Sequence, residues 1–353
     1  MSSVFRKVGT RRKSMPQNAQ YQPKFARPVL VSLFCGAGGM DLGFKQAGFK
    51  VRIAFDISSA AIRSHSKNFP STRSVAADLK ELQPAGVVQL ALEEIPAGSR
   101  IGLIGGPPCQ GFSRANSNSS ANDPRNSLPL LYLEIVKALQ AHFVVEFVVL
   151  ENVPGIRDKK HSLMFSQILD NLASLHFDVT ERELCATDFG VPQNRKRVVI
   201  CGLRSNQGYG EIIIRKIRGL ITVESAIGFI REQPEFFRPG LDPSKIEPHP
   251  NHWTMKPKSQ KFQLGNFDKS GRSFRRLRWD APSPTIAFGN REIHVHPDGT
   301  RRLSIFEAML LQGFPPSFTL EGNLSQQVEQ VSNAVPPQLA KSMATALNRA
   351  MAI

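Results

Sequence analysis

Short apolar runs alternate with longer amphipathic stretches between residues 29 and 204. The runs have the length of strands, and the stretches between them repeat apolar residues at helical spacing. Near-continuous apolar strands separated by helices are typical of a parallel sheet that is covered on both faces. The sequence therefore predicts an α/β fold with a Rossmann-like, doubly wound, mostly parallel sheet. Strands are expected at 29–34, 51–56, 100–106, 146–153 and 196–204, and helices at 38–49, 58–69, 128–143 and 161–177.

The alternation stops after about residue 203. Residues 204–300 hold both tryptophans, many prolines and the basic stretch "RSFRRLR", and they predict a second, smaller, irregular domain. Helical spacing returns in "RRLSIFEAMLLQGF" and "PPQLAKSMATALNRAMAI". The expected organisation is a flexible basic arm at 1–28, a large domain at 29–203, the small domain at 204–300, and C-terminal helices at 301–353 that complete the large domain.

The net charge of the chain gives the strongest indication of a binding partner. Lys and Arg number 45 against 29 Asp and Glu, which gives a net charge of +16. Such an excess favours a polyanionic partner, nucleic acid before an acidic membrane surface, although a merely basic soluble protein stays open. No apolar stretch is long enough to span a membrane, and no signal-peptide core is present. Four cysteines without CxxC pairing or nearby histidines predict no metal site and a reducing compartment.

A glycine-rich turn follows the first expected strand, in "SLFCGAGGMDLGF" at residues 32–44. Glycines there let the backbone turn tightly and approach a ligand, and the following helix N-terminus favours anionic groups. Asp56 ends the second strand about 20 residues on, which suits ribose hydroxyls. Asp78, at a third strand end, could accept from an adenine amino group, and Phe34 could cover the adenine face. Each aspartate could instead cap a helix, but together they favour an adenosine-containing cofactor.

A cysteine stands at the carboxyl end of another expected strand, in "GGPPCQGFSR" at residues 105–114. Cys109 could be a small buried residue in a rigid turn or a nucleophile, since a thiolate is strongly nucleophilic. Pro107 and Pro108 restrict the backbone before it. The polar stretch at 113–126 suits a loop that folds over a substrate, and a passive surface loop fits its composition equally.

A carboxylate follows directly after a further apolar strand, in "VVLENVPGI". Glu151 is costly there unless it is paired, so either a structural ion pair or an acid–base role is required. Arg195 and Arg197 of "QNRKRVVI" lie on one face if this segment is extended. They could hold that carboxylate, a base carbonyl or phosphates.

Six segments in series now suggest a family. "FCGAGG", "PPCQGFS", "ENV", "QNRKR", "RRLSIFEAMLLQGFP" and "SNAVPP" resemble the ordered motifs of DNA (cytosine-5)-methyltransferases of bacterial type. The matches span roughly 30–203 and 285–345, with a basic variable block between the fourth and fifth motifs. Ser332 stands where the family usually has glycine, a departure that we expect to be harmless.

The resemblance implies S-adenosylmethionine as the cofactor, held at the carboxyl ends of the sheet. Phe34 then stacks on the adenine, Asp56 takes the ribose hydroxyls and Asp78 takes the adenine amino group. Asn333 and Val335 support the cofactor pocket. The other expected cofactor-binding residues are Gly36, Gly38, Gly39, Ile57, Leu79 and Pro108.

The resemblance also implies a reaction. Cys109 attacks carbon 6 of a cytosine flipped out of duplex DNA, because a stacked base is unreachable. Glu151 bonds or protonates ring nitrogen 3, Arg197 contacts the base carbonyl and steadies Glu151, and Arg195 supports the loop and backbone. Carbon 5 takes the methyl group, and loss of its proton releases Cys109. The expected function is methylation of a specific DNA sequence, in a restriction-modification system or by a solitary methylase.

The resemblance makes residues 204–300 a target recognition domain, with Trp253 and Trp279 expected to anchor its core. The expected partner is double-stranded DNA, with no membrane and no metal, and the protein is expected to be a cytoplasmic, nucleoid-associated monomer. An RNA cytosine-5 methyltransferase and a non-catalytic DNA-binding relative stay open as alternatives. A cysteine hydrolase is disfavoured, because no histidine lies in the strand-end motifs. The remaining cysteines are expected to be buried small residues: Cys35, Cys185 and Cys201.

Overall fold

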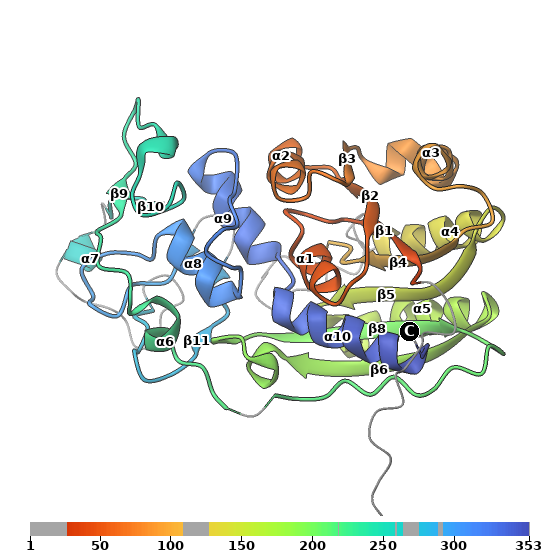
Figure 1. Ribbon diagram of the computed structural model, residues 1–353. Coiled ribbons are helices and arrows are strands. Elements are labelled where there is room, and N and C mark those ends of the chain that lie inside the picture. The colour runs from red at the N-terminus through yellow and green to blue at the C-terminus, as the bar shows by residue number, and fades with distance from the viewer. Residues whose placement is uncertain are drawn as a thin grey trace, which may run out of the picture.

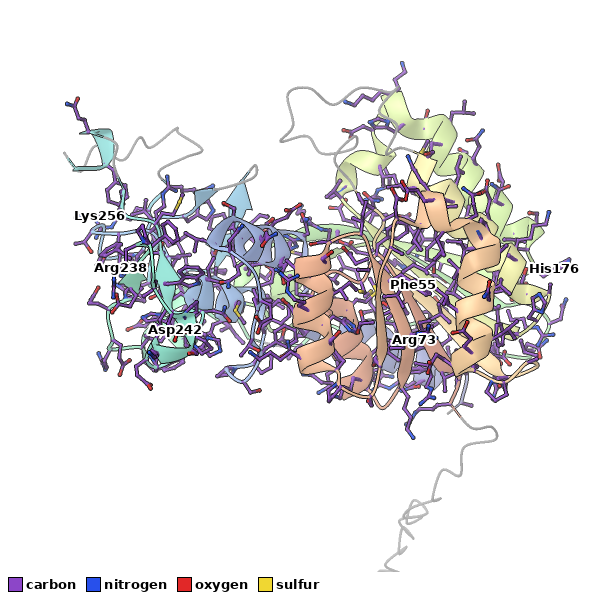
Figure 2. All side chains as sticks on the ribbon, turned by 90° about the horizontal axis from the view of Figure 1, so that it is seen from above. Phe55, Arg73, His176, Arg238, Asp242 and Lys256 are labelled. Atoms are coloured by element: carbon purple, nitrogen blue, oxygen red, sulfur yellow. The ribbon has the colours of Figure 1, made fainter. Side chains whose placement is uncertain are left out.

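The computed structural model describes residues 27–108, 127–217, 219–257, 260–263, 275–288 and 292–352. Its elements form two units that lie side by side (Figure 1). The large unit comprises the described residues of 27–204 together with 335–352, and the small unit comprises those of 222–334. Phe55 and Arg73 mark the large unit in Figure 2, and Arg238 and Asp242 mark the small one. Within the described part of the chain, no helix is long and apolar enough to cross a membrane.

A seven-stranded sheet forms the centre of the large unit, in the order β3-β2-β1-β4-β5-β8-β6. Neighbouring strands from β3 to β5 run parallel, and β8 runs antiparallel to β5 and to β6. The predicted α/β class with a mostly parallel sheet is confirmed. The strands are β1 (Val29–Leu33), β2 (Val51–Asp56), β3 (Arg73–Ala76), β4 (Arg100–Gly105), β5 (Val144–Asn152), β6 (Phe177–Cys185) and β8 (Lys196–Arg204).

Helices cover both faces of this sheet (Figure 1). One apolar core lies between the sheet and α3 (Leu79–Glu94), α4 (Leu128–Gln140) and α5 (Ser162–Ser174). A second core lies on the opposite face, with side chains from α1 (Gly39–Gln46), α2 (Ser59–Asn68) and α10 (Pro337–Ala350). Because both faces are buried, the central strands carry apolar side chains on both sides, which is the pattern visible in the sequence.

Helix α3 and strand β6 of the large unit have no counterpart among the expected elements. Helix α3 contains Pro84, and its backbone breaks at Gln83, where φ is 59°, so it lacks a continuous helical pattern. Strand β6 lies at the edge of the sheet and carries charged, solvent-exposed side chains. Charged residues on an edge strand discourage pairing with other chains, and they also hide the strand from an apolar pattern search.

The small unit has its own apolar core, built around α6 (Val223–Ile227), α8 (Ile305–Gln312) and α9 (Leu324–Asn333). Ser304 begins α8 through a capping box with Glu307, and Arg301 holds the same carboxylate with two hydrogen bonds of 2.8 Å. Of the C-terminal helices expected at 301–353, α8 and α9 pack in this core and α10 packs in the large unit; the domain boundaries expected at 203 and 300 stay predictions. The short elements of the small unit are β9 (Glu235–Phe236), β10 (Trp253–Thr254), α7 (Gln260–Gln263), β11 (Ser283–Pro284), β12 (Ala287–Phe288) and β13 (Glu292–Ile293).

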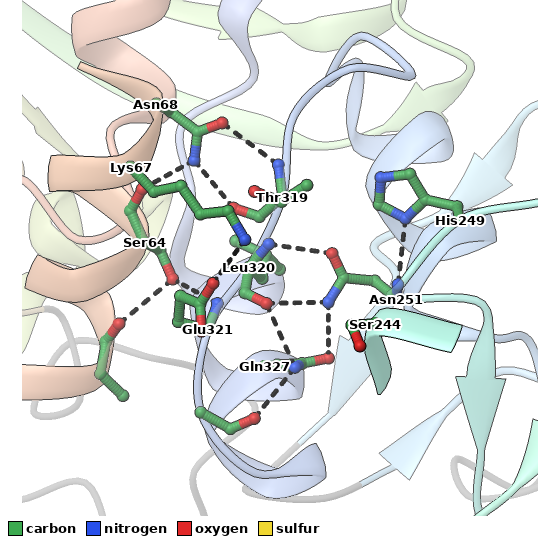
Figure 3. Close-up of polar contacts among 12 residues, drawn as sticks. Ser64, Lys67, Asn68, Ser244, His249, Asn251, Thr319, Leu320, Glu321 and Gln327 are labelled. Carbon is green, nitrogen blue, oxygen red and sulfur yellow. Dashed lines mark hydrogen bonds and ion pairs between the residues drawn. The ribbon is translucent and has the colours of Figure 1, made fainter. Parts of the chain in front are cut away.

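Buried polar contacts join the two units at α2 (Figure 3). Asn68 donates to the carbonyl of Thr319 at 2.8 Å and accepts from its backbone N–H at 3.2 Å. The side chain of Asn251 makes two hydrogen bonds of 2.9 Å with the backbone of Leu320 and a third, of 3.1 Å, with Oε1 of Gln327. The Asn68 amide spans the two units, and the Asn251 amide holds the Leu320 segment inside the small unit, so together they fix the orientation of the small unit against the sheet.

Candidate functional site

The glycine-rich turn after β1 has an unusual backbone. Phe34 has φ 55°, Gly36 has φ 56° and Gly38 has φ 96°. The left-handed region costs a phenylalanine energy, and such strain persists only where surrounding contacts hold it. A methyl group placed on Gly38 would lie 2.4 Å from the ring of Phe69 and 2.9 Å from the ring of His65, so glycine is required for space as well.

The carboxylate of Asp56, at the end of β2, ties this turn to α2. Its Oδ2 accepts from the backbone N–H of Gly36 and its Oδ1 from that of Ser58, both at 2.8 Å. Burial raises the pKa of Asp56 above its ordinary value, and these two hydrogen bonds oppose the rise. A carboxylate has about four acceptor positions, so it can also accept from ligand hydroxyls. Ser58, not Asp56, caps α2.

Open space adjoins the same turn. A Cβ atom built on Gly36 would meet nothing within 4 Å, and the side chain of Ile57 is 68 % exposed. Asp78 caps α3 by accepting from the N–H of Lys80 at 2.8 Å, so the helix-cap interpretation holds at this position. Leu79 is buried in the core beneath the sheet. The cofactor contacts assigned to these residues remain predictions.

The segment at 332–335 packs directly on the start of α1. A Cβ atom on Gly39 would lie 2.4 Å from the carbonyl oxygen of Val335, so only glycine allows this approach. Val335 is buried and Asn333 is exposed. Ser332 lies within α9 without a positive φ, so glycine is not needed at this position.

Glu151 occupies the buried end of β5 and is only 7 % exposed. Its Oε1 lies 2.7 Å from Nε of Arg197, on the neighbouring strand β8. Burial raises the pKa of Glu151, and the Arg197 and Arg195 guanidiniums, in that order, oppose the rise. A raised pKa favours the protonated carboxyl, which can donate a proton.

The Glu151 carboxyl also lies against the segment that leads to the predicted nucleophile. A Cβ atom on Gly106 would lie 3.1 Å from Oε2 of Glu151. The side chain of Asn152 donates to the carbonyl of Pro107 at 3.2 Å. Pro108 is half-buried and ends the described segment. The predicted nucleophile, Cys109, and the polar stretch 113–126 lie outside the described residues.

Arg195 and Arg197 both act on Glu151, but they differ in their other contacts. Arg195 is 2 % exposed and donates to the carbonyl of Ser332 at 2.8 Å. Arg197 forms the direct ion pair. The structure therefore brings the predicted carboxylate and both predicted arginines together where β5 ends and β8 begins. Arg195 links them to the segment at 332–335.

Several other expectations can be compared with the structure. Cys35 and Cys201 are buried, as predicted, whereas Cys185 is only half-buried, at the edge strand, with its thiol 3.1 Å from Oγ1 of Thr187. Trp253 is buried in the small unit and donates to Gln327 at 2.8 Å. Trp279 is 36 % exposed, so its expected role as a core anchor is wrong.

Two buried glutamines at this site lie in the motifs "QNRKR" and "RRLSIFEAMLLQGFP", but the sequence assigned them no role. Gln193 belongs to β7 (Gln193–Asn194) and Gln312 ends α8, and both are completely buried. Gln193 donates to Oε1 of Gln312 at 2.5 Å. Their separation of 119 positions explains why no local pattern revealed the contact. Among the described residues, no group of three or more His, Cys, Asp or Glu could hold a metal ion.

Comparison with known proteins agrees with the geometry. The profile of the C-5 cytosine-specific DNA methylases matches residues 29–349. The chain is 31 % identical over 342 residues to the Type II methyltransferase M.MthTI of Methanothermobacter thermautotrophicus, covering 91 % of this chain and 97 % of that one. It is 31 % identical over 338 residues to M1.HphI of Haemophilus parahaemolyticus, covering 90 % and 86 %.

A solved structure shows the same fold. It belongs to a protein assigned as a DNA modification methyltransferase, encoded within an E. coli prophage, with a TM-score of 0.73 and 26 % identity. The match covers 92 % of this chain and 99 % of the other. The profile match covers nearly the whole described sheet, both arginines and the segment at 332–335. The chain belongs to the C-5 cytosine-specific DNA methylase family, whose enzymes use S-adenosylmethionine as the methyl donor.

Proposed function

We propose that the chain methylates carbon 5 of a flipped-out cytosine in a specific duplex DNA sequence, through a covalent adduct of Cys109 at carbon 6. One observation carries the proposal. The buried carboxyl of Glu151 has a raised pKa, is held by Arg197, and lies against Gly106 in the segment that continues to Cys109. A proton donor beside the nucleophile's segment is the arrangement that addition to a cytosine ring requires.

The residues around the turn at 34–39 fit the cofactor. Open space at Gly36, the apolar surface of Ile57 and the spare acceptor positions of Asp56 suit an adenosine group. Phe34, Asp56 and Asp78 hold it in this proposal, with the remaining contacts from Gly38, Gly39, Leu79, Pro108, Asn333 and Val335. When bound, the cofactor supplies the methyl group from a sulfonium centre to carbon 5.

The chain's own residues do the rest. The Cys109 thiolate forms a bond to carbon 6, and the Glu151 carboxyl gives its proton to ring nitrogen 3, so the ring gains no net charge. Arg197 contacts the base carbonyl while it holds Glu151 in place, and Arg195 anchors the loop and backbone. After carbon 5 gains its methyl group, its proton passes to solvent and the carbon 6–sulfur bond breaks to restore the thiolate. Ring nitrogen 3 then returns its proton to Glu151.

Residues 204–300 act as the target recognition domain in this proposal. Arg275, Arg276 and Arg278 place positive charge on the small unit, suited to the phosphates of duplex DNA. In this proposal the protein works as a monomer. A cytoplasmic, nucleoid-associated location follows from its substrate, and the names of its relatives support a role in a restriction-modification system.

The test is methyl transfer by the purified full chain. Unmethylated plasmid DNA and an RNA transcript of the same sequence are each incubated with radiolabelled S-adenosylmethionine, and the DNA is then mapped by bisulfite sequencing. We expect label in the DNA alone, at one cytosine of a recurring sequence. Label confined to the RNA, or absent from both, would contradict the proposal.

A further inference from the structure

A continuous chain of amide hydrogen bonds runs from Ile286 of the small unit, through Gln193 of the large unit, to Ala334, which immediately precedes the second part of the large unit. The backbone N–H of Ile286 donates to Oε1 of Gln193 at 3.3 Å. Nε2 of Gln193 donates to Oε1 of Gln312 at 2.5 Å and to the carbonyl of Leu311 at 3.3 Å. Nε2 of Gln312 donates to the carbonyl of Ala334 at 2.5 Å. Both glutamine side chains are completely buried, so water cannot replace these partners.

The two ends of the chain of bonds fix its direction. Ile286 offers a backbone N–H, which can only donate, and Ala334 offers a backbone carbonyl, which can only accept. Each glutamine must therefore accept on one side and donate on the other. A shift of either end breaks a bond and leaves a buried amide without a partner, which is unfavourable. The arrangement is consequently specific to one relative position of the two units.

The Ile286 end of this chain of bonds belongs to the small unit, which contacts the segment that contains Arg195 and Arg197. Strand β11 pairs with β7, and the N–H of Ser283 donates to the carbonyl of Pro192 at 2.9 Å. Gln193 lies two positions from Arg195, which donates to the carbonyl of Ser332. Movement of β11 therefore acts on the segment whose arginines adjoin Glu151.

The Ala334 end of this chain of bonds lies at the boundary between the units, next to the cofactor turn. Ala334 precedes Val335, whose carbonyl oxygen lies 2.4 Å from the position that a Cβ atom on Gly39 would occupy. Gly39 begins α1 immediately after the left-handed turn at 34–38. With no free space at this contact, displacement of Ala334 is transmitted to the turn.

We propose that Gln193 and Gln312 are positioning residues that couple DNA binding on the small unit to cofactor binding at the turn 34–39. The proposal rests on the proposed function, because it assigns DNA to the small unit and the cofactor to this turn. When DNA holds β11 in the position seen here, the amide chain holds Ala334 and Val335 against Gly39. Each ligand then tightens the binding of the other by the same factor.

The test measures the dissociation constant of S-adenosylhomocysteine by titration calorimetry, with and without a saturating short duplex that carries the mapped target sequence. In the wild-type chain we expect the duplex to tighten binding at least about fivefold. In Gln312→Met, which keeps the length of the side chain but removes its amide, we expect less than about a twofold effect. A merely structural role would lower the melting temperature without removing this coupling.

Gln327→Met is the matched control, because Gln327 is a buried glutamine of the neighbouring helix α9 whose hydrogen bonds stay within the small unit (Figure 3). We expect it to keep the wild-type coupling. Should Gln312→Met not fold, the double variant Gln193→Met with Gln312→Met replaces both partners by apolar groups and gives the same test. Three results would overturn the proposal. The coupling survives in the Gln312 variants, it is lost only in Gln327→Met, or it is absent from the wild type.

Methyl transfer by the wild-type protein is measured on the same samples. No transfer would contradict the proposed function itself. Transfer with unchanged coupling in the Gln312 variants would contradict only the role of the two glutamines.

Discussion

Acidification should destabilise the small unit before the large one. Burial lowers the pKa of both His249 and His294 to about 4. His249 stacks on Phe306 with ring centroids 4.2 Å apart, and Nε2 of His294 donates to the carbonyl of Thr285 at 2.9 Å. Both imidazoles are therefore neutral when folded, because burial penalises their charged form.

The size of the effect follows from the difference between folded and unfolded pKa values. An unfolded histidine titrates near 6.5, so below that pH the unfolded chain binds more protons than the folded one. The stability contributed by each neutral histidine is present above pH 6.5 and is lost as the pH falls. At about pH 5 each contributes a loss of about 2 kcal/mol, or about 4 kcal/mol for the two. Domains are typically stable by about 5–15 kcal/mol, so this loss is large.

Tryptophan fluorescence makes the effect measurable in the small unit alone. The chain's two tryptophans, Trp253 and Trp279, both lie there. Urea unfolding followed by this signal should give a free energy of unfolding at least about 4 kcal/mol lower at about pH 5 than at about pH 7.5, because burial also lowers the pKa of His252 and His296. His294→Gln should reduce the pH dependence by about 2 kcal/mol, whereas His142→Gln, at an exposed position, should change nothing. Equal pH dependence in wild type and His294→Gln would refute the reasoning.

Three further outcomes follow from individual contacts. Gly39→Ala should lower the free energy of unfolding by about 1–3 kcal/mol in urea unfolding, because its methyl group meets the carbonyl of Val335; an unchanged value would show that the two segments separate freely. Arg301→Met leaves the buried Glu307 without its bidentate partner, and should cost about 3–5 kcal/mol by the same assay. Glu151→Gln should slow methyl transfer by a factor of about 10²–10⁴ with duplex binding retained. Wild-type transfer should slow as rising pH deprotonates the Glu151 carboxyl, whose pKa is raised. A flat pH profile would contradict the role of Glu151 as the proton donor.

Local sequence patterns were sufficient to predict the strands that are buried on both faces of the sheet and the strand that ends at the glycine-rich turn. The strands at 51–56 and 196–204 have the predicted bounds, because buried central strands leave a continuous apolar run. The glycine turn was recognisable because its backbone requires glycine at 36 and 38. Helix α3 was not recognised, since Pro84 interrupts its pattern and the break at Gln83 depends on packing.

Contacts between distant segments could not be predicted from patterns. Arg195 was expected to support a loop, but its hydrogen bond to the carbonyl of Ser332 joins positions 137 apart. The pair formed by Gln193 and Gln312 depends in the same way on how the two units pack. For Asp78 the sequence left two alternatives open, a helix cap and a contact to the cofactor. Its side chain caps α3.

The central claim concerns bond formation by Cys109, and one measurement tests it most directly. The purified chain is incubated with S-adenosylmethionine and a duplex carrying 5-fluorocytosine at the mapped target position. This base cannot lose a proton from carbon 5, so the enzyme cannot be released by elimination. We predict a covalent protein–DNA complex that survives denaturing electrophoresis, with the attachment mapped to Cys109 by mass spectrometry and absent in Cys109→Ala. No such complex from wild-type protein that methylates the normal duplex, or an equal yield from Cys109→Ala, would contradict the account.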